Sequence, residues 1–477
     1  MAANYDVVIV GSGAGGCAAA YHLTQTGKSV LLIERGPVLP VDGSTLDVDK
    51  VLRRGEFKCQ ETWMDADGAA FIPGEFANLG GKTKWYGAAL LRMNPHEFGG
   101  DEAHRCLPWP INYSEIEPYY DEAERLLKVR TFAAEPDLQL IINGLQKRDA
   151  RWQSRPLAIG LNPDILNSPQ EARHFDGFAI PSGHKADGEA ALLARVRQQP
   201  NLQILTSTEV MSLMHETGAA ARINGVVCAD GRKIYAAKVL LAAGALHSPR
   251  LLQSYLRQSG LSLKSAPLVG RYYKCHLNTA LIALSLNSTS DVLRKTTLLL
   301  HDAFPHTSLQ ALGGNLAEEI IGTQLPGFVP RALGGMVGRR AYGFFATTED
   351  GSHFDNCVTA KLNGAALPQL NYAPARLPEA RTEHLRFVRT LQRALLKQGY
   401  FALARHMPLD ATAHACGTLI AGRDPQTSVV DKNGKVHGME NLYVVDGSIL
   451  PRSSRVNPAL TIYAWSLRVA SRLEIMA

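Results

Sequence analysis

The sequence of 477 residues predicts an α/β fold, with a Rossmann-like nucleotide-binding domain built from discontinuous segments and a second domain inserted between them. Three observations support this prediction. The chain opens with a strand–glycine–helix–strand unit, and similar strand-to-helix units return near residues 239 and 442. Between these units, two long stretches lose the glycine signatures and contain short alternating strands. At about 150 residues per domain, the length fits two or three domains.

The N-terminal unit has the order that a dinucleotide-binding turn requires. Tyr5 to Val10 is an apolar, β-branched run, typical of a parallel strand buried on both faces, and a GxGxxG motif follows it directly. A small-residue helix starts at Cys17, and the strand from Ser29 to Ile33 ends in Glu34, whose carboxylate can accept hydrogen bonds from ribose hydroxyls. This unit fits FAD and NAD alike, and a glycine-rich turn without a nucleotide is the alternative. The predicted cofactor residues here are Gly11, Gly13, Ala14, Gly15, Gly16, Glu34 and Arg35.

Later segments continue the same domain. A glycine cluster in residues 78–92 suits close approach of the backbone to a flat ring or a phosphate, although a simple turn before a helix is the alternative. Residues 239–252 read as a strand and then a helix start, with Pro249 in the first turn of that helix. Residues 202–210 and 223–229 read as strands, the second of which leads into a hairpin turn at Asp230-Gly231. Near the C-terminus, strand 442–445 precedes a helix that Pro458 opens and that runs to about Ile475.

The remaining stretches are predicted to form the inserted domain. Residues 1–100, 185–268 and 408–477 are assigned to the nucleotide-binding domain, and residues 101–184 and 269–407 to a substrate-binding domain with a mostly antiparallel sheet and helices. The elements expected there are strands 341–348, 356–362 and 369–372 and helices 113–128 and 379–398.

Composition excludes several classes of function. The formal charge of +6 includes no long block of like charge, so nucleic acid is not an expected partner. Seven scattered cysteines form no CxxC pair, no cluster has metal-ligand spacing, and no GxSxG elbow is present. Apolar runs are too short for an integral membrane segment, and the N-terminus lacks a secretory pattern. We therefore expect a cytoplasmic protein, with its oligomeric state left open.

The residues quoted above resemble the glucose-methanol-choline (GMC) family of flavin-dependent oxidoreductases over essentially the whole chain. The agreement is best in four blocks, which are residues 11–34, 78–92, 239–252 and 414 to the C-terminal helix. This resemblance implies an FAD-binding domain with a substrate domain over the flavin, and it selects FAD over NAD. The residues that it adds to the predicted FAD site are Gly80, Gly81, Thr83, Tyr86, Gly87, Val210, Ala243, Gly244, Asp446, Gly447, Asn457, Pro458 and Thr461.

The resemblance also places the chemistry in two motifs, His414-Ala-Cys-Gly-Thr and Asn457-Pro-Ala-Leu-Thr. His414 is the expected base, because a neutral imidazole can take the hydroxyl proton as a hydride leaves for flavin N5. Asn457 is expected to orient the substrate oxygen. The other histidines considered are predicted to be packing or surface residues, and Cys416 a packing residue. These histidines are His96, His104, His247, His301, His306, His406 and His437.

The expected activity is oxidation of a small-molecule alcohol to an aldehyde or ketone, with oxygen or another acceptor reoxidising the flavin. Trp85 stands where some members of the family carry a histidine that tethers the flavin, so we expect non-covalent FAD. The alternative is a redox-neutral lyase or a photodecarboxylase on the same fold. A binding protein with an inactive site is a third possibility, which the presence of His414 and Asn457 disfavours.

Overall fold

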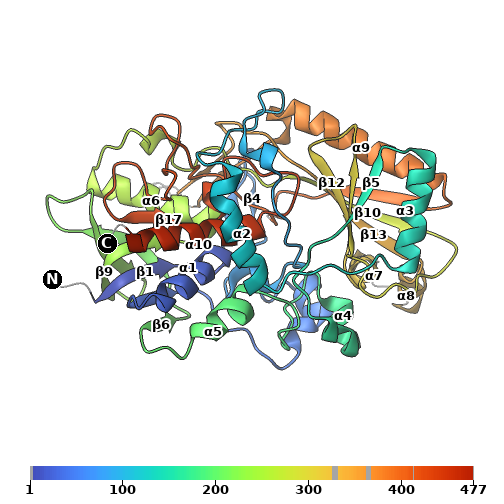
Figure 1. Cartoon of the computed structure of the whole chain (residues 1–477), viewed down its shortest axis with the longest axis horizontal. Coiled ribbons are helices and arrows are strands. Elements are labelled where there is room, and N and C mark those ends of the chain that lie inside the picture. Colours follow the sequence, from blue (N-terminus) through green and yellow to red (C-terminus); the bar gives the residue numbers. More distant parts are fainter. Residues whose placement is uncertain (1–3, 325–330, 361–366, 412, 476–477) are drawn as a thin grey trace.

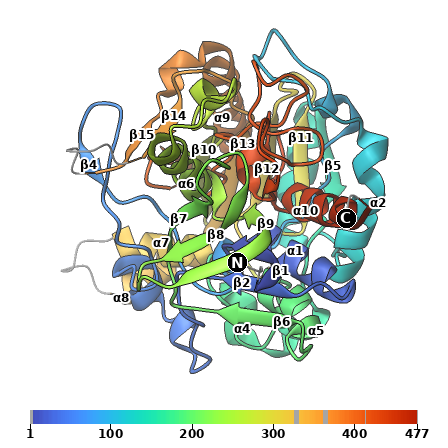
Figure 2. The same cartoon turned by 90° about the vertical axis from the view of Figure 1, so that its left-hand side faces the viewer.

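The nucleotide-binding half is built on a parallel arrangement of strands in the order β6-β2-β1-β9-β17. In the computed structural model, residues 4–324, 331–360, 367–411 and 413–475 are described. Figure 2 shows β6, β2, β1 and β9 side by side. The fully buried runs in β1 and β2 explain their place at the centre of the sheet. The bounds are β1 Tyr5–Val10, β2 Val30–Ile33, β6 Leu202–Leu205, β9 Lys233–Leu241 and β17 Leu442–Val444.

Strand β9 also joins an antiparallel hairpin to this sheet. Its first residues pair with β8 (Ile223–Cys228), which pairs in turn with β7 (Val210–His215). The predicted turn at Asp230-Gly231 is confirmed, with Gly231 at a φ of 84°. The predicted strand 202–210 is divided, because its beginning forms β6 and its last residue begins β7.

Three long helices belong to the same half as the parallel strands, namely α1 (Ala14–Gln25), α6 (Gly244–Ser259) and α10 (Ala459–Ile475). The predicted C-terminal helix is confirmed, but the placement of Pro249 in the first turn of its helix is wrong. Helix α6 begins at Gly244, so Pro249 lies inside it and cannot donate to the carbonyl of Ala245. The hydroxyl of Thr418 donates to that carbonyl instead, at 2.8 Å. A tertiary contact therefore replaces the hydrogen bond that proline removes.

The second half contains a six-stranded sheet in the order β16-β10-β13-β12-β11-β5, in which all pairings are antiparallel. This confirms the predicted antiparallel sheet. Helices α3 (Pro136–Arg148) and α9 (Pro378–Leu396) cover one face, and the nucleotide-binding half lies toward the other (Figure 1). The other elements are β5 Trp152–Pro156, β10 Leu277–Leu284, β11 Thr297–His301, β12 Thr307–Ala311, β13 Ala341–Thr348, β16 Phe401–His406, α7 Leu316–Gln324 and α8 Arg331–Gly338.

Two segments assigned to the inserted domain pack against the nucleotide-binding half. Helix α2 (Tyr113–Leu126) packs on α10, and its buried residues belong to the same core as β1 and β2. Strands β14 (Cys357–Thr359) and β15 (Gln369–Asn371) form a small sheet with β3 and β4, and β14 contacts α6. The domain boundaries themselves stay a prediction, and residues 361–362 of predicted strand 356–362 lie outside the described residues. The remaining bounds are β3 Trp63–Met64, β4 Ala70–Phe71, α4 Pro169–His174 and α5 Ala194–Val196.

Within the part of the chain that the structure describes, no helix combines the length and the apolar character needed to cross a membrane.

Candidate active site

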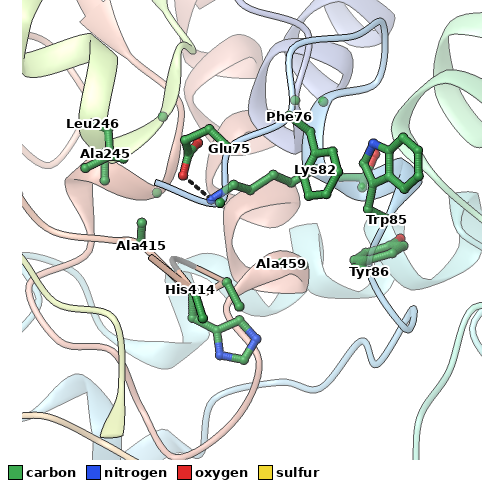
Figure 3. A pocket seen from close by; sticks show the side chains of 18 of the residues that line it. Glu75, Phe76, Lys82, Trp85, Tyr86, Ala245, Leu246, His414, Ala415 and Ala459 are labelled. Carbon is green, nitrogen blue, oxygen red and sulfur yellow. Dashed lines mark hydrogen bonds and ion pairs between the residues drawn. The ribbon is translucent and has the colours of Figure 1, made fainter. Parts of the chain in front are cut away.

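A cavity of about 1220 Å³ lies between the two halves. One wall is formed by the loops that follow the carboxyl ends of β1, β2, β9 and β17, where ligands of open parallel sheets bind. The opposite wall is the uncovered face of the six-stranded sheet. Figure 3 shows His414 and Ala459 within this cavity, together with Lys82, Trp85 and Tyr86 from the glycine-rich loop.

Most of the predicted cofactor residues line this cavity. They are Gly11, Gly13, Ala14, Gly15, Glu34, Arg35, Gly81, Thr83, Tyr86, Gly87, Val210, Ala243, Gly244, Asp446, Gly447, Asn457 and Pro458. Gly16, Gly80 and Thr461 are not among the lining residues. Gly16 lies against the carbonyl of Gly11, as expected for close helix–strand packing, and the Thr461 hydroxyl lies 2.7 Å from that of Tyr120. Gly80 donates its amide to Ser12.

The glycine turn fits a dinucleotide. A Cβ atom added at Gly13 would meet no atom within 4 Å, so this residue faces open space at the N-terminus of α1. Glu34 is 6% exposed, and its Oε2 accepts from the amide and hydroxyl of Ser12, while its Oε1 accepts from the Gly36 amide. Because a carboxylate oxygen has two lone pairs, Oε1 keeps room for a ribose hydroxyl.

Asp446 ties two of the cavity loops together. Its Oδ2 accepts from the Gly244 amide at 2.8 Å and from the Ser248 hydroxyl, and its Oδ1 accepts from the amide and hydroxyl of Ser448. Burial raises the pKa of this carboxyl, while the hydrogen bonds from Ser248 and Ser448 oppose that rise. The start of α6 and the turn after β17 are thereby held in one geometry beside the cavity.

The two predicted catalytic residues meet in the cavity. Asn457 Nδ2 lies 3.2 Å from His414 Nε2. The orientation of the Asn457 amide is fixed by Gln310, whose Nε2 donates to Asn457 Oδ1 at 2.6 Å. Gln310 comes from β12 of the six-stranded sheet, so both halves of the molecule contribute to this pair.

His276, which the sequence analysis did not single out, contacts the other side of His414. Their Nδ1 atoms lie 2.9 Å apart, and His276 Nε2 lies 2.8 Å from the carbonyl oxygen of Ser454 and 3.1 Å from that of Ser453. Carbonyl oxygens only accept, so His276 Nε2 is the donor and Nδ1 of a neutral His276 is an acceptor. The network therefore assigns the His414 proton to Nδ1 and leaves a lone pair on His414 Nε2, facing Asn457.

Backbone strain is typical of a functional site around His414, and electrostatics keep this histidine neutral. His276 and Ser454 both have left-handed backbones, with φ of 64° and 67°, and such conformations of non-glycine residues concentrate at functional sites. Burial holds the pKa of His414 well below its usual range, and the positive charges of Lys295 and Lys82 lower it further. His414 is thus neutral at neutral pH, the state that can accept a proton.

A buried ion pair is a second feature that sequence reasoning missed. Lys295 Nζ lies 2.8 Å from Asp176 Oδ2, which also accepts from the Gly313 amide at 2.8 Å. Both charged side chains line the cavity. They pack over Gly87, where an added Cβ atom would lie 2.2 Å from Asp176 Oδ1. No sequence motif joins these residues, so only the fold reveals their contact.

One group of possible metal ligands occurs among the described residues, formed by His104, His306 and Glu383. Both ring nitrogens of His306 and the Nε2 of His104 already have partners. His306 contacts Glu383 and Asp101 at 3.0 Å each, and His104 Nε2 lies 2.7 Å from the carbonyl oxygen of Glu349. This cluster reads as a structural hydrogen-bond network. Cys416 is fully buried with a raised thiol pKa, in keeping with a packing residue.

A nucleotide-binding sheet and a neutral histidine beside a carboxamide, facing one cavity, define an oxidoreductase with a nucleotide cofactor. Sequence profiles described as GMC oxidoreductase match residues 5–278 and 368–466. The chain therefore belongs to the GMC oxidoreductase family, and its cofactor is FAD.

Individual relatives span nearly the whole chain. It is 27% identical to paromamine 6'-oxidase of Streptomyces fradiae, over 98% of this chain and 90% of that protein. It is 24% identical to 2-methyl-1,2-propanediol dehydrogenase of Mycolicibacterium austroafricanum, over 98% and 94%. The structure of an FAD-dependent oxidoreductase from Chaetomium thermophilum aligns with a TM-score of 0.70, at 14% identity, over 99% of both chains.

Proposed function

We propose that this protein oxidises an alcohol to an aldehyde or ketone, with His414 as the base and Asn457 as the group that orients the substrate oxygen. The observation that carries the proposal is the 3.2 Å contact between Asn457 Nδ2 and His414 Nε2 at the cavity wall. A hydroxyl oxygen placed against these two atoms would accept from the carboxamide and donate its proton to the imidazole. The relatives named paromamine 6'-oxidase and 2-methyl-1,2-propanediol dehydrogenase support the same chemistry.

In this mechanism, the hydroxyl proton moves to His414 Nε2 while a hydride leaves the carbinol carbon and the carbonyl double bond forms. FAD, when bound, supplies the hydride acceptor. Residues of the glycine turn, the glycine-rich loop and the start of α10 would hold it. The imidazolium formed on His414 keeps its Nδ1 proton directed at His276, so the ring needs no rotation between proton uptake and release.

FAD in this protein is proposed to be non-covalent. Trp85 donates its indole N–H to Asn78 at 2.9 Å and stacks on Phe76, so it offers no nucleophile. Among the described residues that line the cavity, the histidines are His247, whose nitrogens both contact guanidinium groups at 3.1 Å, and His414. Acid precipitation should release the yellow colour into the supernatant. Colour that remains in the protein pellet would contradict this assignment.

The direct test of the activity is anaerobic bleaching of the flavin absorbance near 450 nm by an added alcohol. The His414→Ala variant should bind flavin normally but reduce it at least about 100-fold more slowly, as is typical for loss of a general base. Reduction at the normal rate would remove His414 from the mechanism. Product formation with the flavin remaining oxidised would instead identify a redox-neutral reaction. Reoxidation by air, followed after reduction, separates an oxidase from a dehydrogenase.

A further inference from the structure

The six-stranded sheet presents an apolar surface to the active-site cavity. Side chains of β10 alternate, so that Leu281 and Ala283 are buried in the core beneath α9, whereas Ala280 and Ile282 face the cavity. In the neighbouring strands, Leu403 lies opposite Ile282, and Phe345 lies opposite Ala280. We call the apolar side chains on this side of the cavity the apolar wall, which consists of Ala280, Ile282, Leu312, Ile320, Phe345 and Leu403.

The apolar wall starts at the catalytic pair. Gln310, which donates a hydrogen bond to Asn457, is the cross-strand neighbour of Phe345. Phe345 is paired in turn with Ala280 of the next strand. A substrate whose hydroxyl contacts His414 and Asn457 would therefore place its remaining atoms against these side chains. Leu403, on the edge strand β16, is 54% exposed and marks the outer end of the wall.

The polar groups on the same side already have partners. Gln310 donates to Asn457, and Lys295 is paired with Asp176, which also accepts from Gly313. Arg405 on β16 stands opposite Ala280, in the same cross-strand row as Gln310 and Phe345, and it also interacts with another group of the protein. A sugar bound here would bury several hydroxyls beside carbon atoms, and each hydroxyl without a hydrogen bond lowers affinity. An alkyl or aryl group would gain affinity by covering the same surface.

We infer that the substrate is a primary or secondary alcohol with an apolar alkyl or aryl body, bound along the apolar wall, in preference to a sugar or an amino sugar. This inference rests on the alcohol oxidation proposed above and specifies its substrate class. It separates this protein from the paromamine oxidase that it resembles at 27% identity.

A series of straight-chain primary alcohols from ethanol to 1-hexanol, with benzyl alcohol, glucose and glucosamine for comparison, tests the inference on the FAD-loaded protein. The rate constant for anaerobic flavin reduction divided by the apparent dissociation constant should rise about three- to fourfold for each added methylene. Glucose and glucosamine should react more slowly than 1-hexanol. A flat series, or faster reduction by glucose or glucosamine, would overturn the inference while leaving alcohol oxidation intact.

The variant Leu403→Gln examines the wall itself. Because the Leu403 side chain is largely exposed, the variant should fold normally. Its rate constant for flavin reduction divided by the apparent dissociation constant should fall about tenfold with 1-hexanol and stay unchanged with ethanol. Leu140→Gln is the matched control, because Leu140 is 65% exposed on α3, which covers the opposite face of the sheet. An unchanged chain-length dependence in Leu403→Gln, or an equal loss in Leu140→Gln, would contradict the assignment.

Binding measured without turnover separates this inference from the proposed activity. In His414→Ala, titration of the oxidised flavin spectrum should give a lower dissociation constant for 1-hexanol than for glucose, and Leu403→Gln added to that variant should reduce this difference about tenfold. If no alcohol bleaches the wild-type flavin but this preference persists, the proposed oxidation fails and the apolar site stands. If the flavin is bleached without the preference, the apolar site is refuted.

Discussion

His276 and His414 face each other because of an antiparallel bridge two residues away on each segment. The backbone groups of Lys274 and Cys416 exchange hydrogen bonds of 2.8 and 2.9 Å, which hold the two segments side by side, and the left-handed backbone of His276 follows two residues later. The bridge therefore sets the 2.9 Å contact between the two imidazoles. The protonation pattern of the proposed base thus depends on a backbone register, and not on the His414 motif alone.

Replacement of His276 should impair flavin reduction without affecting substrate affinity. In His276→Phe, His414 loses the acceptor for its Nδ1 proton, so both tautomers become populated and the ring is no longer held. We expect the limiting rate of anaerobic flavin reduction to fall about 10- to 100-fold, with the apparent dissociation constant unchanged.

His276→Gln is the matched variant, since a carboxamide can donate to the Ser454 carbonyl and accept from His414. It should recover most of the lost rate. A normal rate in His276→Phe would show that His276 has only a structural role.

Gln310 is expected to control the orientation of the Asn457 amide. Gln310→Leu removes the donor to Asn457 Oδ1, so the carboxamide can turn and the rate of flavin reduction should fall about tenfold, in line with the loss of one positioned hydrogen bond. Gln310→Glu should be slower still, because a carboxylate would attract Asn457 Nδ2 and turn the carbonyl oxygen toward His414 Nε2. Stopped-flow reduction of both variants checks this order, and equal rates would refute the orienting role.

Two neighbouring glycines should respond differently to alanine. The Cβ atom of Gly15→Ala would lie 1.9 Å from the carbonyl oxygen of Val445, so this variant should be destabilised by several kcal/mol even as apoprotein. Gly13→Ala meets nothing within 4 Å and has an ordinary φ of −65°, so its apoprotein should melt normally. It should nevertheless bind FAD more weakly, because the methyl group enters the space predicted for the pyrophosphate. Thermal melting of both apoproteins and a flavin titration of Gly13→Ala decide this.

His384 should make the folded protein sensitive to acid. It is 3% exposed, its two nitrogens each lie 2.7 Å from a threonine hydroxyl, and burial together with the nearby His406 lowers its pKa to about 3. Below pH 6.5 the unfolded chain binds a proton at this residue and the folded protein does not, so the free energy of unfolding falls by about 1.4 kcal/mol per pH unit down to about pH 3.

Urea unfolding of wild type and His384→Gln measures this contribution. Between pH 7 and pH 5, the variant should lose about 2 kcal/mol less than the wild type, whereas above pH 7 the difference between the two proteins should stay constant. An equal loss in both proteins over the acid range would show that His384 is protonated in the folded state.

The sequence by itself determined those features that local pattern and spacing specify. The buried run of β1, the GxGxxG turn, Glu34 and the helix that follows Pro458 are all encoded within short segments, and the structure has them where the sequence predicted them. His414 and Asn457 were also predicted, because each lies in a motif that resembles the family. Local physics decides such elements, since strand burial, turn geometry and helix starts depend on neighbouring residues.

Only the tertiary structure decided what contacts those residues. His276 lies 138 positions before His414, and Gln310 lies 147 positions before Asn457, so neither partner leaves a periodic or spaced signal. Pro249 shows the same limit, because the hydroxyl of Thr418 makes a proline inside α6 tolerable. Alternation in β10 could be predicted, but which of its two faces is covered by α9 and which meets the cavity depends on how the sheet packs. Long-range packing therefore fixed the tautomer of the proposed base and the apolar character of the site.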